Sequence, residues 1–585
     1  MLMVRGERGM NRPAIGARQF INGALSFVVL AAMLALFFAY RERAIILHAP
    51  RVSVSIGKLP YYAYCSFYRM LAAYLLALAF SIPYGMAAAR GRLWERVLIP
   101  AVDIAQSVPV VGFFPAAIYF FVALAHGGRL GVEMAAIFLI FTSQAWNMTL
   151  GVFEAVKTIP ADSLEALEAF GASGWLKFRR LLMPASVPKL VYNSILSWVA
   201  GWYFLIACEI ISVGPAQSYR LPGLGSFLME TADRGQTLDM VLGLLMLLAV
   251  IVAMDVIVWQ PLSAWAEKFR FEFAASSGPA RSLGMPGVLG WVGPRIAQSV
   301  QALFRPPARA LKRAIASVPA VHLVSRERAA QAGRAMRILV AGALLISSAY
   351  AVAAGLIALA RALLQPWPSE VREIPAATIA STLRMIVAYA LSLGWTVPCA
   401  LAAAESPRFN RILAPAAEIA GSIPATALFP MIVLFVIKVT GGMNLASVLL
   451  ILTGMQWYLL FNLLAGVNQV PEDLKEAARA FGLSRLATWR KLTLPAVMPS
   501  LITGSLTAWG GGWNALILSE FFVYRGHTYQ VMGLGALLDD ATYRTGNGTM
   551  ILLSLLSMVL VVITLNRLIW RRLYDLATER YRLDY

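Results

Sequence analysis

Four ionisable residues stand inside long apolar segments of the sequence. Arg69 and Arg384 lie in two such segments, and Glu209 and Glu520 lie in two others. A charge inside a bilayer is costly unless it is paired or faces a polar cavity. Two kinds of chemistry therefore stay open at this point: an arginine–glutamate ion pair that joins two helices, or an arginine that guides an anionic solute.

The sequence offers little for covalent catalysis. It has only four histidines, and its three cysteines (Cys65, Cys208 and Cys399) lie in apolar segments without the spacing of metal ligands, which is typical of small core residues. It contains no G-x-x-x-x-G-K-[ST] phosphate-binding loop. We therefore expect no catalytic residue, no metal and no cofactor bound by this chain, and no hydrolysis of ATP by it.

The composition predicts an integral membrane protein. The 585 residues are 59% hydrophobic and 14% charged, whereas ordinary globular domains have about 45–50% apolar and about 25% charged residues. Apolar runs long enough to cross the bilayer recur along the chain. The predicted spans cover residues 20–40, 62–89, 100–125, 131–155, 185–213 and 236–262, then 337–362, 377–404, 412–438, 443–467, 495–523 and 546–570.

These twelve spans fall into two sets of six, so the expected fold class is an all-α membrane protein with two parallel six-helix repeats. Parallel duplication is a transporter design that places the solute path between the halves. The predicted boundaries are a basic N-terminus and first helix (1–60), a first half (61–262), a basic linker (263–336), the first helix of the second half (337–374), a second half (375–573) and a tail (574–585).

Charge sets the predicted orientation. The formal net charge is +20, and in a membrane protein such an excess is typical of cytoplasmic loops rather than of nucleic-acid binding. This positive-inside rule places both termini, the 263–336 linker and the loops after residues 155 and 467 in the cytoplasm. The loop with Arg41, Arg43, Arg51 and Lys58 disagrees with this scheme.

The repeat also aligns polar and proline residues inside the spans. The segment "AQSVPVVGFFP" parallels "AGSIPATALFP", and "WNMTLGV" parallels "FNLLAGV". Prolines in a span free backbone carbonyls, so they either line a path or produce ordinary kinks. The aligned path candidates are Ser107, Pro109, Asn147, Ser422, Pro424 and Asn462.

A water-facing segment is repeated as well: "EALEAFGASGWLKFRRLLMP" returns as "EAARAFGLSRLATWRKLTLP". Just upstream of each quoted segment an Asp stands three residues before its first Glu: Asp162 before Glu165, and Asp473 before Glu476. This spacing predicts a capping box at the start of a short helix. Gly171 and Gly482 then predict a sharp turn at its end.

This spacing resembles the "EAA" loop of bacterial ABC importer permeases of the nitrate/sulfonate/taurine/bicarbonate branch, here with two halves fused. The resemblance covers roughly 60–260 and 375–570, and the first copy departs from the pattern at Leu167 and Met183. It implies that each loop docks on a separate ATP-binding subunit that holds ATP and Mg. The matching positions are Glu165, Ala166, Gly171, Pro184, Glu476, Ala477, Ala478, Gly482 and Pro495.

The resemblance also implies the bacterial inner membrane as location, a small anion as substrate and a periplasmic or lipid-anchored substrate-binding protein as partner. A twelve-span secondary transporter driven by an ion gradient is the main alternative, because it also has parallel repeats. It would need neither the capped cytoplasmic helices nor a partner ATPase.

Overall fold

The computed structural model describes residues 52–107, 114–171, 174–212, 218–269, 366–423, 442–468, 470–524 and 527–570, with isolated positions elsewhere. Several predicted features lie outside these residues: the span 20–40, nearly all of the span 337–362, most of the 263–336 linker, Pro109, Pro424 and most of the tail.

Both halves are helical, and their described elements follow a similar order. The first half contains α2 (Leu59–Ala89), α3 (Arg92–Ser107), α4 (Phe114–Leu124), α5 (Arg129–Lys157), α6 (Ala161–Ala169), α7 (Gly174–Lys177), a π-helical turn (Phe178–Leu182), α8 (Met183–Glu209), β1 (Ile210–Ser212), β2 (Ser218–Arg220), α9 (Leu224–Asp233), α10 (Thr237–Met254), a second π turn (Asp255–Trp259) and α11 (Gln260–Ala266). The second half contains α14 (Ile374–Glu405), α15 (Pro407–Ser422), α17 (Met443–Asn468), α18 (Glu472–Ala480), α19 (Arg485–Thr488), a π turn (Trp489–Thr493), α20 (Leu494–Glu520), β3 (Phe521–Tyr524), β4 (His527–Gln530), α21 (Leu534–Asp539), a π turn (Asp540–Arg544), α22 (Gly548–Leu565) and a last π turn (Asn566–Trp570).

The expected all-α membrane fold is confirmed. Seven helices in the part of the chain that the structure describes are long and apolar enough to cross a membrane, against twelve expected for the whole chain. Two antiparallel hairpins, β1–β2 and β3–β4, are small additions after α8 and α20. One apolar core contains residues of both halves, among them Trp202 and Trp513, so the halves pack as a single body.

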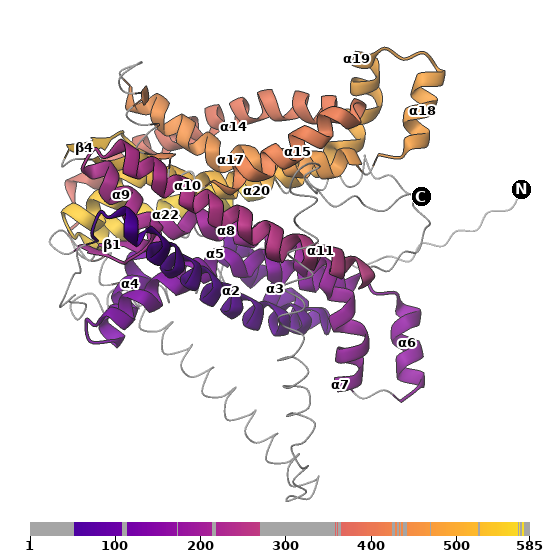
Figure 1. The fold of residues 1–585 in the computed structure, drawn as a ribbon, viewed down its shortest axis with the longest axis horizontal. Coiled ribbons are helices and arrows are strands. Elements are labelled where there is room, and N and C mark those ends of the chain that lie inside the picture. Colours follow the sequence, from indigo (N-terminus) through magenta and orange to yellow (C-terminus); the bar gives the residue numbers. More distant parts are fainter. Residues whose placement is uncertain are drawn as a thin grey trace, which may run out of the picture.

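The two halves lie side by side along parallel helices (Figure 1). The α6–α7 unit of the first half and the α18–α19 unit of the second both project from the same end of the molecule, while β1, β4 and α9 lie at the opposite end. The repeated water-facing segments are therefore on one side, as parallel repeats require.

The predicted span 412–438 is wrong: α15 already begins at Pro407 and ends at Ser422, where Ile423 is extended. In the first half the matching span 100–125 is described only in part, because residues 108–113 lie outside the described residues. There α3 already begins at Arg92, and the charges of Arg92, Glu95 and Arg96 make its first turns unsuited to hydrocarbon.

A π-helical turn precedes the first proline of α8 and of α20. In the first half the N–H of Met183 bonds the carbonyl of Phe178, five residues earlier, and Pro184 follows directly. Leu494 bonds Trp489 in the same way before Pro495. A proline ring clashes with the carbonyl four residues earlier in a regular α-helix. The wider π turn therefore lets one long helix continue through the proline.

Candidate functional site

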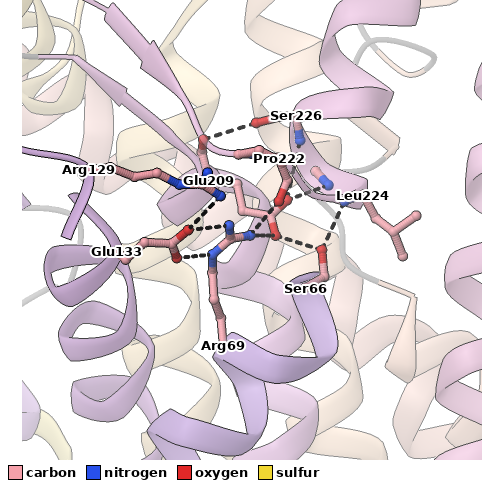
Figure 2. Close-up of polar contacts among 9 residues, drawn as sticks. Ser66, Arg69, Arg129, Glu133, Glu209, Pro222, Leu224 and Ser226 are labelled. Carbon is pink, nitrogen blue, oxygen red and sulfur yellow. Dashed lines mark hydrogen bonds and ion pairs between the residues drawn. The ribbon is translucent and has the colours of Figure 1, made fainter. Parts of the chain in front are cut away.

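The first candidate site is a buried ion-pair cluster that surrounds Arg69 of α2 (Figure 2). Arg69 Nη1 lies 2.9 Å from Glu209 Oε1 at the end of α8. Its Nε and Nη2 donate to the two carboxylate oxygens of Glu133, near the start of α5, at 2.6 and 2.9 Å. Nη1 also donates to the carbonyl of Pro222 at 2.9 Å. All three guanidinium nitrogens are thus engaged, and the side chain is 1% exposed.

The Glu209 carboxylate is surrounded by donors as well. It accepts hydrogen bonds from Ser66 Oγ at 2.6 Å and from the Gly225 N–H at 2.7 Å. The segment at the start of α9 wraps closely around it: a Cβ atom on Gly223 would lie 2.1–2.3 Å from the carboxylate atoms. Only glycine fits there, because no other residue lets the backbone approach so closely.

The second half repeats this arrangement with one difference. Arg384 Nη1 lies 2.5 Å from Glu520 Oε1, and Ser381 Oγ donates to the same oxygen at 2.7 Å. Gly533 occupies the place of Gly223 against the carboxylate. The Nε of Arg384, however, donates to the amide oxygen of Asn444 at 3.1 Å, where Arg69 meets a second carboxylate.

A second acid does lie near Glu520, on another element. Asp539 ends α21 and is buried. Burial, and then the neighbouring Glu520 carboxylate, raise the pKa of Asp539 well above its ordinary value. Each half thus combines one buried arginine with two acids, but the second acid contacts the arginine only in the first half, among the contacts of the described residues.

This geometry joins α2, α5 and α8 in the first half, and α14 and α20 in the second, to the loop that follows each hairpin. Buried charges are tolerated when they are paired and fully hydrogen-bonded. A solute anion would have to displace a carboxylate to reach Arg69. Between the two kinds of chemistry that the sequence left open, the contacts therefore favour the structural pair.

The second candidate site consists of the short helices α6 and α18. They begin after Pro160 and Pro471, and no side chain caps either start. The predicted capping boxes are therefore wrong: Asp162 lies inside the first turn of α6, past the N-cap position. A carboxylate there still interacts favourably with the free N–H groups of the helix start.

The turns at the ends of these helices are confirmed. Gly171 and Gly482 both have φ of 65°, a left-handed conformation that favours glycine. The residue just before each glycine is a strongly exposed aromatic: Phe170 is 87% exposed and Phe481 is 83% exposed. A large apolar side chain that stands in water at the same place in both copies is typical of a protein contact surface.

The other motif residues divide into outward and inward positions. Glu165, Ala166 and Glu476 are exposed, Ala477 is half-buried and Ala478 is buried. Leu167 is half-buried and aligns with the buried Ala478, so the first copy departs from the family pattern at a position that is shielded from solvent. Nearby, Lys177 donates to Glu168 at 2.6 Å and thereby lowers the pKa of Glu168.

The predicted path residues do not join these sites. Ser107 and Ser422 are the last residues of α3 and α15. Asn147 is half-buried in α5. Asn462 donates to the Tyr458 carbonyl of its own helix at 2.8 Å and packs against Gly504 of α20.

Sequence reasoning missed several members of the clusters. Ser66 and Ser381 each stand three residues before the arginine, a repeat visible in the sequence. It also missed an aromatic triad in each half, whose ring centroids lie 5.6–5.7 Å apart in the first half and 5.7–5.8 Å apart in the second. The triads are Tyr74, Trp198 and Trp259, and Tyr389, Trp509 and Trp570.

A helical bundle with two parallel repeats, membrane-length helices and one exposed helix per repeat defines a transport protein of the membrane. Within that class, the chain belongs to the family of binding-protein-dependent transport system inner membrane components, whose profile matches residues 81–259 and again 396–574. The two matches correspond to the two halves, so one chain carries two copies of the family unit.

Curated relatives include permeases with different named solutes. The chain is 31% identical over 124 residues to the nitrate import permease protein NrtB of Leptolyngbya laminosa (21% of this chain, 42% of the relative). It is 28% identical over 160 residues to the taurine transport system permease protein TauC of Escherichia coli (27% and 57%). It is 25% identical over 187 residues to the bicarbonate transport system permease protein CmpB of Synechocystis sp. (32% and 62%). The chain thus spans about half the length of the curated relatives it matches.

Proposed function

We propose that the chain is the transmembrane subunit of an ATP-driven importer, and that α6 and α18 each dock on an ATP-binding subunit. The observation that carries this proposal is the pair of exposed phenylalanines, Phe170 and Phe481, on matched helices at one end of the molecule. A secondary transporter has no need for two such surfaces. The family membership supports the same conclusion.

The proposal includes the partners and the solute. The ATP-binding subunits would hold ATP and Mg, so this chain would hydrolyse nothing itself. A periplasmic or lipid-anchored binding protein would deliver a small anion such as nitrate, a sulfonate (taurine for example) or bicarbonate to the hairpin end. The names of the relatives support the anion. The α6–α18 end would be cytoplasmic, as would both termini, in a bacterial inner membrane.

Copurification tests the docking surfaces. A tagged chain extracted from its native membranes in mild detergent should bring an ATPase with it. The double variant Phe170→Glu/Phe481→Glu should lose that activity, because a charge replaces the apolar contact on each helix. Leu238→Glu is the matched control: Leu238 is also strongly exposed, but it lies at the start of α10, which follows α9 at the opposite end.

Retention of the ATPase by the double variant would contradict docking through these helices. Uptake of the solute along an ion gradient, by the purified chain without an ATPase, would favour the secondary transporter.

A further inference from the structure

Between Ile502 and Glu520, α20 leaves one face incompletely buried, and the positions towards its N-terminal part are polar. Thr503 and Gly510 are exposed, and Thr507, Asn514 and Leu518 are half-buried. These positions recur at intervals of three or four residues, so they form one continuous stripe along the helix. The first four provide two hydroxyl groups, a bare backbone position and a side-chain amide.

This stripe does not have the properties of a lipid-facing surface. From Ile502 to Glu520, most of the other positions of α20 are buried. The continuous helical segment Thr237–Ala266 is different: it is strongly apolar, and only 22% of its most apolar stretch is buried, as a helix in contact with lipid requires. Polar groups in contact with lipid are costly, so they are found facing the bundle interior or water. An exposed polar stripe flanked by buried positions therefore indicates contact with water.

The stripe faces the first half of the molecule. At its outer end, Leu518 packs in an apolar cluster that includes Ala232 and Tyr203 of the first half. Beside its middle, Gly511 packs directly against the ring of Tyr458. Tyr458 and Tyr203 both pack against the apolar core that the two halves share. The boundary between the halves is therefore closed by apolar side chains near the hairpins, while the stripe becomes more exposed towards the end from which α6 and α18 project.

The repeat gives the first half a corresponding stripe with another character. When Glu209 is aligned with Glu520, the matching positions on α8 are Tyr192, Leu196, Val199, Tyr203 and Ala207. Tyr192 is exposed and the other four are half-buried, so this face of α8 is also the accessible one. It is aromatic and apolar. The two pseudo-equivalent helices thus present one hydrogen-bonding surface and one apolar surface.

We propose that Thr503, Thr507, Gly510 and Asn514 form the polar wall of the solute path, open towards the α6–α18 end and closed at Leu518 in this conformation. The proposal rests on the transport function proposed above. The stripe contains no charged residue, so a small solute would be held by hydrogen bonds alone.

The hydroxyl groups are suited to a passing ligand. Thr503 Oγ1 and Thr507 Oγ1 now donate to carbonyls one turn earlier in their own helix, at 3.0 and 3.1 Å. A hydroxyl can rotate its hydrogen towards a solute at little cost, because the carbonyl can still accept the backbone N–H of the helix. Conduction needs binding that is weak enough to permit release. Neutral donors in a row meet that condition better than a fixed arginine.

Cysteine labelling tests whether the stripe contacts water. In a chain whose three cysteines are replaced by alanine, single cysteines are placed at Thr503, Gly510 and, as a buried control on the same helix, Ala508. A Cβ at Gly510 meets no atom within 4 Å, so Gly510→Cys should fold normally. Leu245→Cys, on the exposed apolar face of α10, is the lipid control. Inside-out vesicles are treated with a charged methanethiosulfonate or with lipophilic N-phenylmaleimide.

Cysteines at 503 and 510 should react with the charged reagent ~10-fold or more faster than the cysteine at 508, because a thiol must reach water to ionise and react. Leu245→Cys should react only with the lipophilic reagent. If the cysteines at 503 and 510 behave like the one at 245, the stripe faces lipid; if they behave like the one at 508, the boundary is sealed. Either result overturns the proposal. Labelling needs no ATPase and no solute, so it can fail or succeed independently of the proposed import.

Discussion

Neutralising the buried glutamate of each half should have unequal consequences. Glu520→Gln leaves Arg384, which is 9% exposed, without a carboxylate partner among the described contacts: its acceptors are then the neutral glutamine oxygen, the Asn444 side chain and the Met532 carbonyl. Leaving one buried charge without its counter-ion costs about 3–5 kcal/mol of unfolding free energy. We expect a loss of that size.

Glu209→Gln should cost less. Arg69 keeps both hydrogen bonds to the Glu133 carboxylate, at 2.6 and 2.9 Å, so its charge remains paired. The loss is then that of one charge-assisted hydrogen bond, about 1.5–3 kcal/mol. The second half should therefore be the more sensitive of the two, although the glutamates are equally buried.

Thermal unfolding of the purified variants in detergent measures the difference. Glu168→Gln is a control: among the described residues, this exposed glutamate pairs with Lys177 at the surface, and its removal should leave the midpoint of thermal unfolding unchanged. Equal losses for Glu209→Gln and Glu520→Gln, or a larger loss in the first half, would refute the reasoning.

A double-mutant cycle on the same pair checks the mechanism. Arg384→Leu and Glu520→Leu should each destabilise strongly, whereas the double variant should recover much of the loss, because no lone charge remains. Strictly additive losses would show that the two residues do not stabilise each other.

Three further predictions concern single positions. Gly223→Ala and Gly533→Ala should each abolish accumulation of folded protein, because the added Cβ would overlap a glutamate carboxylate. Gly394→Ala is the control and should be tolerated, because a Cβ there has open space around it. Fluorescence-detected size-exclusion chromatography measures the folded protein in all three variants. Gly482→Val should reduce ATPase copurification more than Gly482→Asn, because asparagine tolerates the left-handed conformation and valine does not. Asp539 has a raised pKa in the folded state, so the folded protein becomes less stable as the pH rises from the unfolded pKa of about 3.9 towards the folded value. Asp539→Asn should remove that part of the fall of the thermal midpoint with pH. An unchanged pH profile of the midpoint would contradict this prediction.

The long helices could be predicted from sequence because an apolar run of membrane length is a direct signal. The expected span 443–467 became α17 (Met443–Asn468), and 62–89 became α2 (Leu59–Ala89). The end of α15 at Ser422 was missed because composition does not show where a helix stops inside an apolar region. The helix starts at Pro160 and Pro471 were mistaken for capping boxes because Asp and Glu at the right spacing suit either the cap or the first turn.

The candidate sites were predictable only in part, for a related reason. Arginines and glutamates inside apolar segments are conspicuous, so Arg69, Glu209 and their counterparts were found. Glu133 was not, because it stands near the end of a span beside Arg129, where a charge needs no special explanation. The polar stripe of α20 could not be predicted for another reason. Threonine, glycine and asparagine are common inside helices, and they indicate a solute path only when the packing shows which side of the helix is left exposed.

Because both halves are joined in one chain, the two halves can differ in sequence, whereas the subunits of a homodimer cannot. In a two-fold assembly of identical subunits, every residue near the axis occurs twice, so a tyrosine at one level must face a second tyrosine across the path. Here Tyr203 and Asn514 occupy equivalent positions and differ. In this chain, one side of the path can therefore change to recognise the solute while the other side keeps the apolar surface that closes against it. A homodimer of half-length permeases cannot separate these two roles, because each substitution appears on both sides of the path.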